Sequence, residues 1–254
     1  MTSQFFWHEL MTSDTKAAQK FYSDVVGWTA EDSGAPGMEY TLFNTKGQGV
    51  CGMLQITPDM AGHGARPGWL GYISVDDVDQ TLSHLKQEGG KAYMGAQEVP
   101  GIIRFAMVAD PQGAPFYVAK GLRTDPPAPL PIGTPGTVGW NELMAADWQS
   151  AFAFYEKLFG WTKDQPHDMG PMGIYQLFAA GGPAIGGMMN KPATLPVSFW
   201  GYYFNVPAID AGTARITASG GKVLNGPMQV PGGQWVVQAM DPQGAAFNLV
   251  APQR

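Results

Sequence analysis

The sequence predicts an α+β fold built from two tandem copies of one unit, and three observations support this. The 254 residues are 44% hydrophobic and 14% charged, a composition typical of a globular chain with a substantial core. With 34 Gly and 21 Pro, the secondary structure must be interrupted often, which favours short strands over long helices. Blocks of sequence also recur about 130 positions apart. We therefore expect two α+β domains rather than a helical bundle.

Matching blocks in the same order define the repeat. The block from Trp7 to Met11 is answered by the block from Trp140 to Met144, 133 positions later. Further pairs are Asp14 with Asp147, Phe21-Tyr22 with Phe154-Tyr155, Gly27-Trp28 with Gly160-Trp161, Gly52-Met53 with Gly187-Met188, Gly71-Tyr72 with Gly201-Tyr202, and the Asp-Pro-Gln-Gly-Ala runs that begin at Asp110 and Asp241. This period is too long for solenoid or propeller repeats of roughly 20–50 residues, so each copy should be a domain with its own core.

A proline-rich segment separates the copies. Between Gly121 and Pro135 the prolines are Pro126, Pro127, Pro129, Pro131 and Pro135. This composition favours an extended polyproline conformation over packed structure. We therefore predict a first domain over residues 1–122, a linker over residues 123–136 and a second domain over residues 137–254.

The first half of the first copy predicts a strand, a helix and three strands. Alternation from Phe5 to Met11 indicates a strand that places Trp7 and Glu9 on one face and His8 on the other. Asp14 is a typical N-cap and Gly27 a typical helix stop. The buried face of this helix is expected to consist of Ala18, Phe21, Tyr22 and Val25. Strands are expected around Trp28, from Tyr40 to Phe43 and from Val50 to Leu54.

The second half of the copy repeats this order. A strand from Trp69 to Val75 precedes a helix capped by Asp76 or Asp77 and ended by Gly89-Gly90. The buried stripe of that helix is expected to be Val78, Leu82 and Leu85. Strands are then expected near Tyr93, from Arg104 to Val108 and from Pro115 to Ala119. Each copy is thus predicted to contain two βαβββ modules.

This order of elements resembles the vicinal oxygen chelate superfamily, which includes glyoxalases, bleomycin-resistance proteins and extradiol dioxygenases. The resemblance is carried by Asp at the helix start, Phe-Tyr inside the helix, Gly-Trp after it and Asp-Pro-Gln-Gly before the last strand. The Trp-x-Glu-Leu opening of both copies is similar to two-domain members described as glyoxalase-like or hydroxylase-like. The resemblance implies that paired modules form cupped mixed sheets with helices outside, and that a small molecule sits in the cup.

The resemblance also implies where metal-using members hold a divalent metal. The first position lies seven residues before the helix-capping Asp, and the others lie on the fifth and last strands. In this chain these positions are Trp7, Leu70 and Tyr117 in the first copy, and Trp140, Trp200 or Gly201, and Asn248 in the second. None of these residues is a usual ligand for a divalent metal. No metal and no cofactor is therefore expected, and the alternative is a metal lyase or dioxygenase whose ligands are shifted by one or two positions.

Glu9 and Glu142 are the candidate catalytic residues. Strand alternation places each carboxylate on the same face as the tryptophan two residues before it. Burial in an aromatic pocket would raise the pKa of such a carboxyl toward the range useful for general acid or base catalysis. The alternative is a structural carboxylate. The candidate ligand-binding residues are Trp7, Tyr72, Tyr117, Trp140, Tyr202 and Asn248, although core packing is the alternative for each aromatic one.

The remaining chemistry-bearing residues do not indicate a second kind of site. Neither the four histidines nor Cys51 shows the spacing of a metal or nucleophile site, and the glycines around Gly181 are expected to form a hairpin turn. The net charge of −6, with dispersed Lys and Arg, argues against nucleic acid as a partner.

No segment is apolar enough to span a membrane, and the single cysteine favours the cytoplasm. The expected partner is a small-molecule ligand, and a homodimer is left open. The sequence leaves two functions, a metal-independent enzyme that uses Glu9 or Glu142, or a protein that captures its ligand without transforming it.

Overall fold

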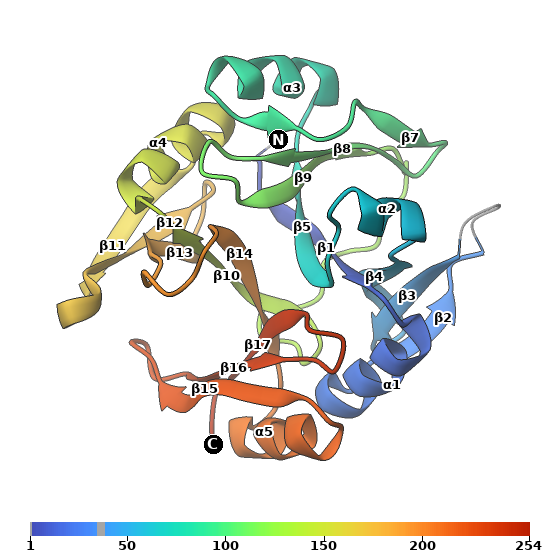
Figure 1. The fold of residues 1–254 in the computed structure, drawn as a ribbon, viewed down its shortest axis with the longest axis vertical. Helices are drawn as coiled ribbons and strands as arrows, with labels where there is room; N and C mark the ends of the chain where they lie inside the picture. Colours follow the sequence, from blue (N-terminus) through green and yellow to red (C-terminus); the bar gives the residue numbers. More distant parts are fainter. Residues whose placement is uncertain (1, 35–38) are drawn as a thin grey trace. The chain divides into compact units, whose positions relative to one another are not determined.

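The computed structural model describes residues 2–34 and 39–254, and their elements follow the predicted order (Figure 1). The first copy contains β1 (Phe5–Thr12), α1 (Thr15–Val26), β2 (Thr29–Asp32), β3 (Tyr40–Thr45), β4 (Gln48–Gln55), α2 (Pro58–Gly62), β5 (Gly68–Ser74), α3 (Val78–Gln87), β6 (Lys91–Ala92), β7 (Gln97–Val99), β8 (Ile103–Ala109) and β9 (Pro115–Gly121). The short elements α2 and β7 have no counterpart in the prediction.

The second copy repeats the pattern. It contains β10 (Val138–Ala145), α4 (Trp148–Phe159), β11 (Thr162–Asp168), the 3-10 turn η1 (Gly170–Met172), β12 (Ile174–Ala179), β13 (Ala184–Asn190), β14 (Phe199–Asn205), α5 (Ile209–Ala218), β15 (Lys222–Gln229), β16 (Trp235–Met240) and β17 (Ala246–Ala251). Residues 122–137, between β9 and β10, carry no helix or strand. The predicted domain boundaries at residues 122 and 137 stay a prediction.

The strands belong to one nine-stranded and one eight-stranded mixed sheet. Within them the same four-stranded group occurs four times, as β2-β3-β4-β1, β5-β9-β8-β6, β11-β12-β13-β10 and β14-β17-β16-β15. In each group the first and last strands of the module are paired and run parallel. The chain passes from one to the other through a helix and two or three further strands, a crossover connection of the length that parallel strands need. Each long helix packs against strands of its own module. The predicted α+β class, built from βαβββ modules, is confirmed.

The compact units of the chain do not coincide with the two sequence copies. One unit contains Met1–Phe6, Leu70–Pro126 and Trp140–Trp200, and the other contains Trp7–Trp69, Pro127–Gly139 and Gly201–Arg254. We call them unit 1 and unit 2. Each unit thus combines a module from the first copy with a module from the second, so the expectation that each copy has its own core was wrong.

Helix α1 of unit 2 forms for the reasons that the sequence suggests. The Asp14 carboxylate accepts a hydrogen bond from the Ala17 amide at 3.0 Å, and Gly27 ends the helix with a φ of 90°. The predicted face of Ala18, Phe21, Tyr22 and Val25 is buried. Figure 1 shows α5 near α1, and the two helices are in contact. The buried face therefore packs between elements of both copies.

Aromatic rings fill the core of each unit. In unit 2 the ring of Trp28 stacks on that of Phe43 at 4.8 Å, and the Phe204 ring from the second copy meets Trp28 at 5.0 Å. In unit 1 the ring of Trp161 stacks on that of Phe178 at 4.6 Å. Trp28 and Trp161 are 2% and 0% exposed, so both are packing residues of the core.

A buried chain of hydrogen bonds joins the two copies inside each unit. In unit 2 the Trp69 indole donates to the Tyr22 hydroxyl at 2.9 Å, and that hydroxyl donates to the Asp241 carboxylate at 3.1 Å. In unit 1 the same chain runs from Trp200 to Tyr155 and on to Asp110, at 2.9 and 3.1 Å. The Phe-Tyr helix motif and the Asp-Pro-Gln-Gly turn motif therefore recur because each contacts the other across the copies.

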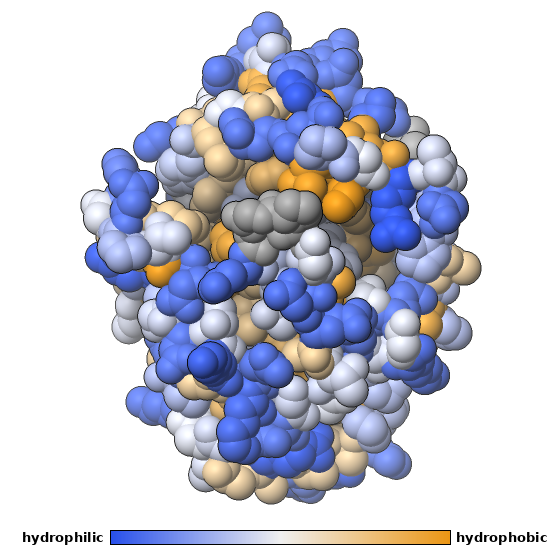
Figure 2. All heavy atoms as spheres, turned by 90° about the vertical axis from the view of Figure 1, so that its right-hand side faces the viewer, coloured by the Kyte–Doolittle hydropathy of each residue, from blue (hydrophilic) through white to orange (hydrophobic). Residues whose placement is uncertain are grey.

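The surface and the helices add two observations. On the face shown in Figure 2, hydrophilic residues predominate and apolar residues are confined to small areas. Within the described ranges, no helix is long and apolar enough to span a membrane.

Candidate active site

Glu9 lies in a hydrogen-bonded group on β1 and β3 of unit 2. The Trp7 indole donates to the Tyr40 hydroxyl at 3.0 Å, and the Tyr40 hydroxyl donates to the Glu9 carboxylate. Glu9 is 4% exposed. Burial raises the pKa of Tyr40 well above its usual value, and the negative charge of Glu9 raises it further. Tyr40 therefore keeps its proton at neutral pH and presents it to Glu9.

A glycine makes room for this group. Gly52 on β4 lies opposite Glu9 on the neighbouring strand, and a Cβ atom at Gly52 would collide with the hydroxyl and ring of Tyr40. The tyrosine thus lies directly over the backbone of β4, where only glycine leaves enough space. Gly52 is in this way part of the site, because it lets Tyr40 reach Glu9.

The second copy repeats the arrangement in unit 1. The Trp140 indole on β10 donates to the Tyr175 hydroxyl on β12 at 2.7 Å, and a Cβ atom at Gly187 on β13 would collide with the Tyr175 ring. Glu142 pairs with Gly187 across the strands and is 7% exposed. The sequence expectation that each Glu shares a strand face with a tryptophan agrees with this placement, and the catalytic role of Glu9 and Glu142 stays a prediction.

Two of the predicted binding residues lie together on β5 and β9 of unit 1. Tyr72 and Tyr117 are paired in the parallel ladder, and their rings stack with centroids 4.2 Å apart and planes at 14°. Phe105 on β8 lies 5.9 Å from the ring of Tyr117. The stacked rings form a continuous aromatic face, and both tyrosines are nearly buried, at 5% and 6% exposed.

The side chain of Tyr202 is not on the strand face that carries Asn248. Asn248 on β17 pairs with Tyr203, not with Tyr202. Tyr202 shares a strand face with Trp200 and Phe204, whose rings pack in the aromatic cores. Trp69 and Trp200 are equivalent positions of the two copies, because each indole donates to the tyrosine of the helix motif, Tyr22 or Tyr155. The pairing of Gly71-Tyr72 with Gly201-Tyr202 was therefore wrong by one residue, and Tyr203 is the counterpart of Tyr72.

The superfamily's metal would require nitrogen, oxygen or sulfur donors that converge. Among residues 2–34 and 39–254, no group of three or more His, Cys, Asp or Glu residues is placed to hold a metal ion. Trp7 and Trp140 occupy the first-strand ligand positions, and the indole N–H of each donates a hydrogen bond to a tyrosine hydroxyl. The residues present at these positions do not fit a divalent metal.

Other reactive side chains are buried or lie elsewhere. The ring of His8 is 6% exposed and meets the Tyr202 ring edge-on at 4.7 Å. Cys51 is fully buried, and burial raises the pKa of its thiol, as expected for a packing residue. His167 lies on β11, and the glycines at 186 and 187 lie on β13, after the hairpin turn.

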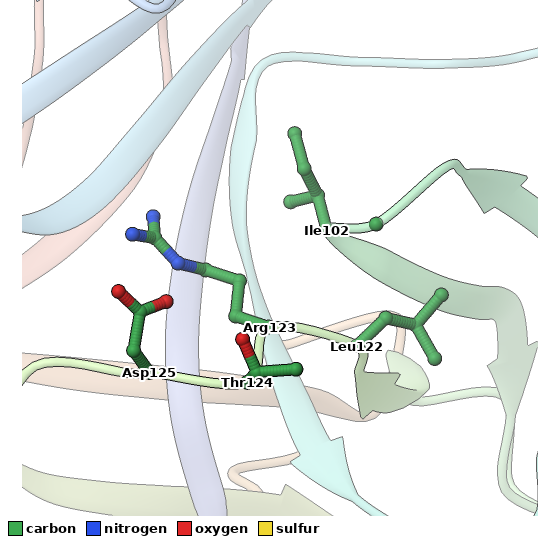
Figure 3. Close-up of a pocket in the computed structure, with 6 residues that line it drawn as sticks. Ile102, Leu122, Arg123, Thr124 and Asp125 are labelled. Atoms are coloured by element: carbon green, nitrogen blue, oxygen red, sulfur yellow. The ribbon is translucent and has the colours of Figure 1, made fainter.

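A shallow pocket of about 440 Å³ lies in unit 1, where the linker leaves β9. Figure 3 shows Ile102 and Leu122 on one side of it, and the side chains of Arg123 and Asp125 extending on the other. A second, more polar pocket of about 560 Å³ adjoins α3. Neither pocket is lined by a predicted site residue, so neither replaces the strand faces as the candidate site.

The chain matches a family model described as the Glyoxalase/Bleomycin resistance protein/Dioxygenase superfamily over residues 4–118 and 137–249. The chain belongs to this superfamily. The two matched stretches are the two copies of the repeat. Members of the superfamily share this fold, and the pattern of Asp, Phe-Tyr, Gly-Trp and Asp-Pro-Gln-Gly indicated it from the sequence.

Three related proteins of the superfamily extend this result. "Putative glyoxylase CFP32" of Mycobacterium tuberculosis is 33% identical over 249 residues, which cover 97% of this chain and 94% of that protein. "Anthracycline biosynthesis protein DauV" of Streptomyces sp. (strain C5) is 31% identical over 260 residues, covering 96% and 91%. The Mn(II)-bound glyoxalase from Novosphingobium aromaticivorans has a TM-score of 0.68 at 15% identity over 99% of this chain and 82% of that one, and so shows the fold alone.

Sequence reasoning missed Tyr40 and Tyr175. Tyr40 was placed in a predicted strand, but neither tyrosine was connected to Glu9 or Glu142. A signal for them was present, because Tyr40 and Tyr175 are 135 positions apart, the same separation as Gly52 and Gly187. A repeated tyrosine at the spacing of a repeated glycine indicates a shared contact.

Proposed function

We propose that this chain binds a small aromatic molecule against the strand faces that carry Glu9 and Glu142, without the metal site usual in its superfamily. The observation that carries this proposal is the repeated group of Trp, Tyr, Glu and Gly. In each copy the tryptophan stands at the position of the first metal ligand and holds a tyrosine hydroxyl instead. The site therefore offers aromatic surface and a carboxylate where metal-using members offer an ion.

The proposed role of Glu9 is to accept a hydrogen bond or a proton from the ligand. Tyr40 donates to one part of the carboxylate, and an ionised carboxylate has about four acceptor positions. A protonated Tyr40 also fixes the direction of the carboxylate, which a general base requires. Glu142 has the same strand position and nearly the same burial in unit 1.

The ligand class is supported by the aromatic surface of Tyr72 and Tyr117 and by a relative. DauV is named for anthracycline biosynthesis. Anthracyclines are flat, hydroxylated polycyclic aromatics, and flat rings bind well to stacked tyrosines. We therefore include a flat aromatic ligand in the proposal. The cytoplasmic location and the homodimer stay predictions.

Titration of the full-length protein with 1,4-dihydroxyanthraquinone tests the proposal, with quenching of tryptophan fluorescence as the signal. Glu9→Gln and Glu142→Gln preserve volume and remove the charge, so each should leave the melting temperature nearly unchanged. We expect at least one of them to weaken binding about tenfold, the loss of one hydrogen bond to a charged group. If both variants bind like the parent, the two residues are structural carboxylates.

The same titration separates capture from catalysis. Recovery of the unchanged anthraquinone after long incubation indicates capture, and a new product indicates turnover. The remaining alternative, a metal enzyme with shifted ligands, is tested by measuring the metal content of protein purified without chelators. Stoichiometric iron, manganese, nickel or zinc would contradict the metal-independent part of the proposal.

A further inference from the structure

The faces of the two C-terminal modules differ at equivalent positions. In the second copy, Tyr203, Asn248, Gln238 and Asn225 lie side by side on β14, β17, β16 and β15. We call these four residues the amide row. In the first copy, Tyr72, Tyr117 and Met107 occupy the equivalent positions on β5, β9 and β8, and we call them the tyrosine row. Residues paired across a sheet point to the same side, so each row forms one surface.

Hydrogen bonds order the amide row. The Gln238 side-chain nitrogen donates to the Tyr203 hydroxyl at 3.2 Å, and the Asn225 side-chain nitrogen donates to the Gln238 oxygen at 3.2 Å. The Asn248 side-chain nitrogen donates to the backbone carbonyl of Tyr202 at 3.3 Å. These bonds fix the orientation of each amide, so that the oxygen of Asn248 is presented in one direction.

The Asn248 oxygen is the acceptor that the row offers to a ligand. In the described part of the chain no group donates a hydrogen bond to it, and Asn248 is only 9% exposed. The oxygen is not fully buried, so a ligand donor can take the place of water there. The neighbouring side chains of the row carry no charge, so an ionic ligand group would be poorly compensated there.

The tyrosine row offers a different chemistry. The rings of Tyr72 and Tyr117 are stacked at 4.2 Å, and the third member, Met107, is apolar. The residue equivalent to Asn248 is therefore an aromatic ring in the first copy. Stacked rings of this kind attract a flat ring, and the first copy has no amide at these positions.

We propose that the amide row selects an uncharged ligand that carries a hydroxyl or N–H group, which donates to the Asn248 oxygen, whereas the tyrosine row presents stacked rings at the equivalent positions. This inference rests on the proposed function and adds the ligand chemistry of the second copy. A ligand that covers this oxygen without donating to it leaves the acceptor unpaired, so the site rejects an analogue that lacks the donor.

Binding of 2-naphthol and 2-methylnaphthalene to the full-length protein tests this proposal, since the two probes differ by a hydroxyl in place of a methyl group. Equilibrium dialysis should show one class of sites that prefers 2-naphthol about tenfold, as expected for one hydrogen bond. Asn248→Leu should reduce this preference to about one while 2-methylnaphthalene still binds. The matched control is Gln229→Leu, which replaces an exposed amide on β15 outside the row and should leave the preference unchanged.

Each outcome decides the proposal. Equal binding of both probes to the parent protein, a preference that survives Asn248→Leu, or no binding of either probe would overturn it. If Asn248→Leu does not fold, Asn248→Phe provides the aromatic ring that the first copy carries there and should also lose the preference. Dependence of anthraquinone binding on Glu9 or Glu142, together with equal binding of the naphthalenes, would overturn this inference and leave the proposed function intact.

Discussion

At the scale of single residues, the site depends on two glycines, because a Cβ atom at either position would collide with a tyrosine. Tyr40 reaches Glu9 because Gly52 has no side chain, and Tyr175 lies over Gly187 in the same way. The glycine, the tyrosine and the tryptophan are separate in the sequence, and each alone would be unremarkable. Their repetition in both copies shows that the close packing is a property of the module.

Gly52→Ala should therefore displace Tyr40 and destabilise the protein. Inserting a methyl group into a well-packed site costs about 1–3 kcal/mol in the free energy of unfolding, which urea denaturation measures. Gly49→Ala on the same strand is the control. Its Cβ would meet atoms no closer than 3.5 Å, so a change within about 0.5 kcal/mol is expected there. Equal effects of the two substitutions would contradict the account of Tyr40.

At the scale of elements, the strands and long helices were predictable because their signals are local. Alternation located β1, and Asp14 and Gly27 located the ends of α1. The short α2 and β7 were missed, since neither is long enough to show a period. The one-residue error at Tyr202 arose because Gly-Tyr occurs in both copies by sequence but in different registers of the strand.

The contact between the Asp110 turn and α4 carries a pH dependence. Burial raises the pKa of the Asp110 carboxyl above its usual value, although hydrogen bonds from Ala114 and Tyr155 oppose this. The folded protein therefore holds the proton more tightly than the unfolded chain. The resulting stabilisation is present below the usual carboxyl pKa of 3.8 and is lost as the pH rises through the raised folded value.

Asp110→Asn removes this titration and keeps an acceptor oxygen for the Gln112 and Ala114 amides. The stability of the variant relative to the parent should therefore increase as the pH rises from about 3 to neutral, measured by urea denaturation at several pH values. Asp110→Ala also removes the acceptor and should cost about 1–3 kcal/mol at all pH values. A relative stability of Asp110→Asn that falls with pH would show the opposite shift.

At the scale of the whole molecule, the two sequence copies exchange modules. Tyr22 of the first copy needs Asp241 of the second, and Tyr155 of the second needs Asp110 of the first. Each compact unit accordingly draws on both copies. A cut in the linker alone leaves these contacts between the copies in place, and they are lost only when the two halves are produced separately.

Residues 1–122 and 137–254 should therefore be unstable when produced separately and should regain a cooperative melting transition when mixed. Each half alone exposes an aromatic face that the other half covers in the intact chain. Circular dichroism melting of the halves and of their mixture measures this. A half that melts alone at the temperature of the intact protein would show that its core is complete without the other copy.

Chelators should leave the melting temperature unchanged. A metal that binds only the folded state stabilises it by RT ln(1 + [L]/Kd), so its removal lowers the melting temperature. The residues at the superfamily's ligand positions offer no such site in either copy. Differential scanning calorimetry with and without EDTA measures the effect, and a fall of several degrees would restore the metal alternative.

The sequence by itself determined the duplication, the four βαβββ modules and the superfamily, because strand alternation, helix caps and repeated blocks are local or periodic signals. It also placed Glu9 beside Trp7, since residues two apart share a strand face. Only the tertiary structure decided that Tyr40 bonds to Glu9, that Tyr203 rather than Tyr202 pairs with Asn248, and that each core combines both copies. These facts depend on contacts between residues far apart in the chain, and a periodicity carries no information about which distant surfaces meet.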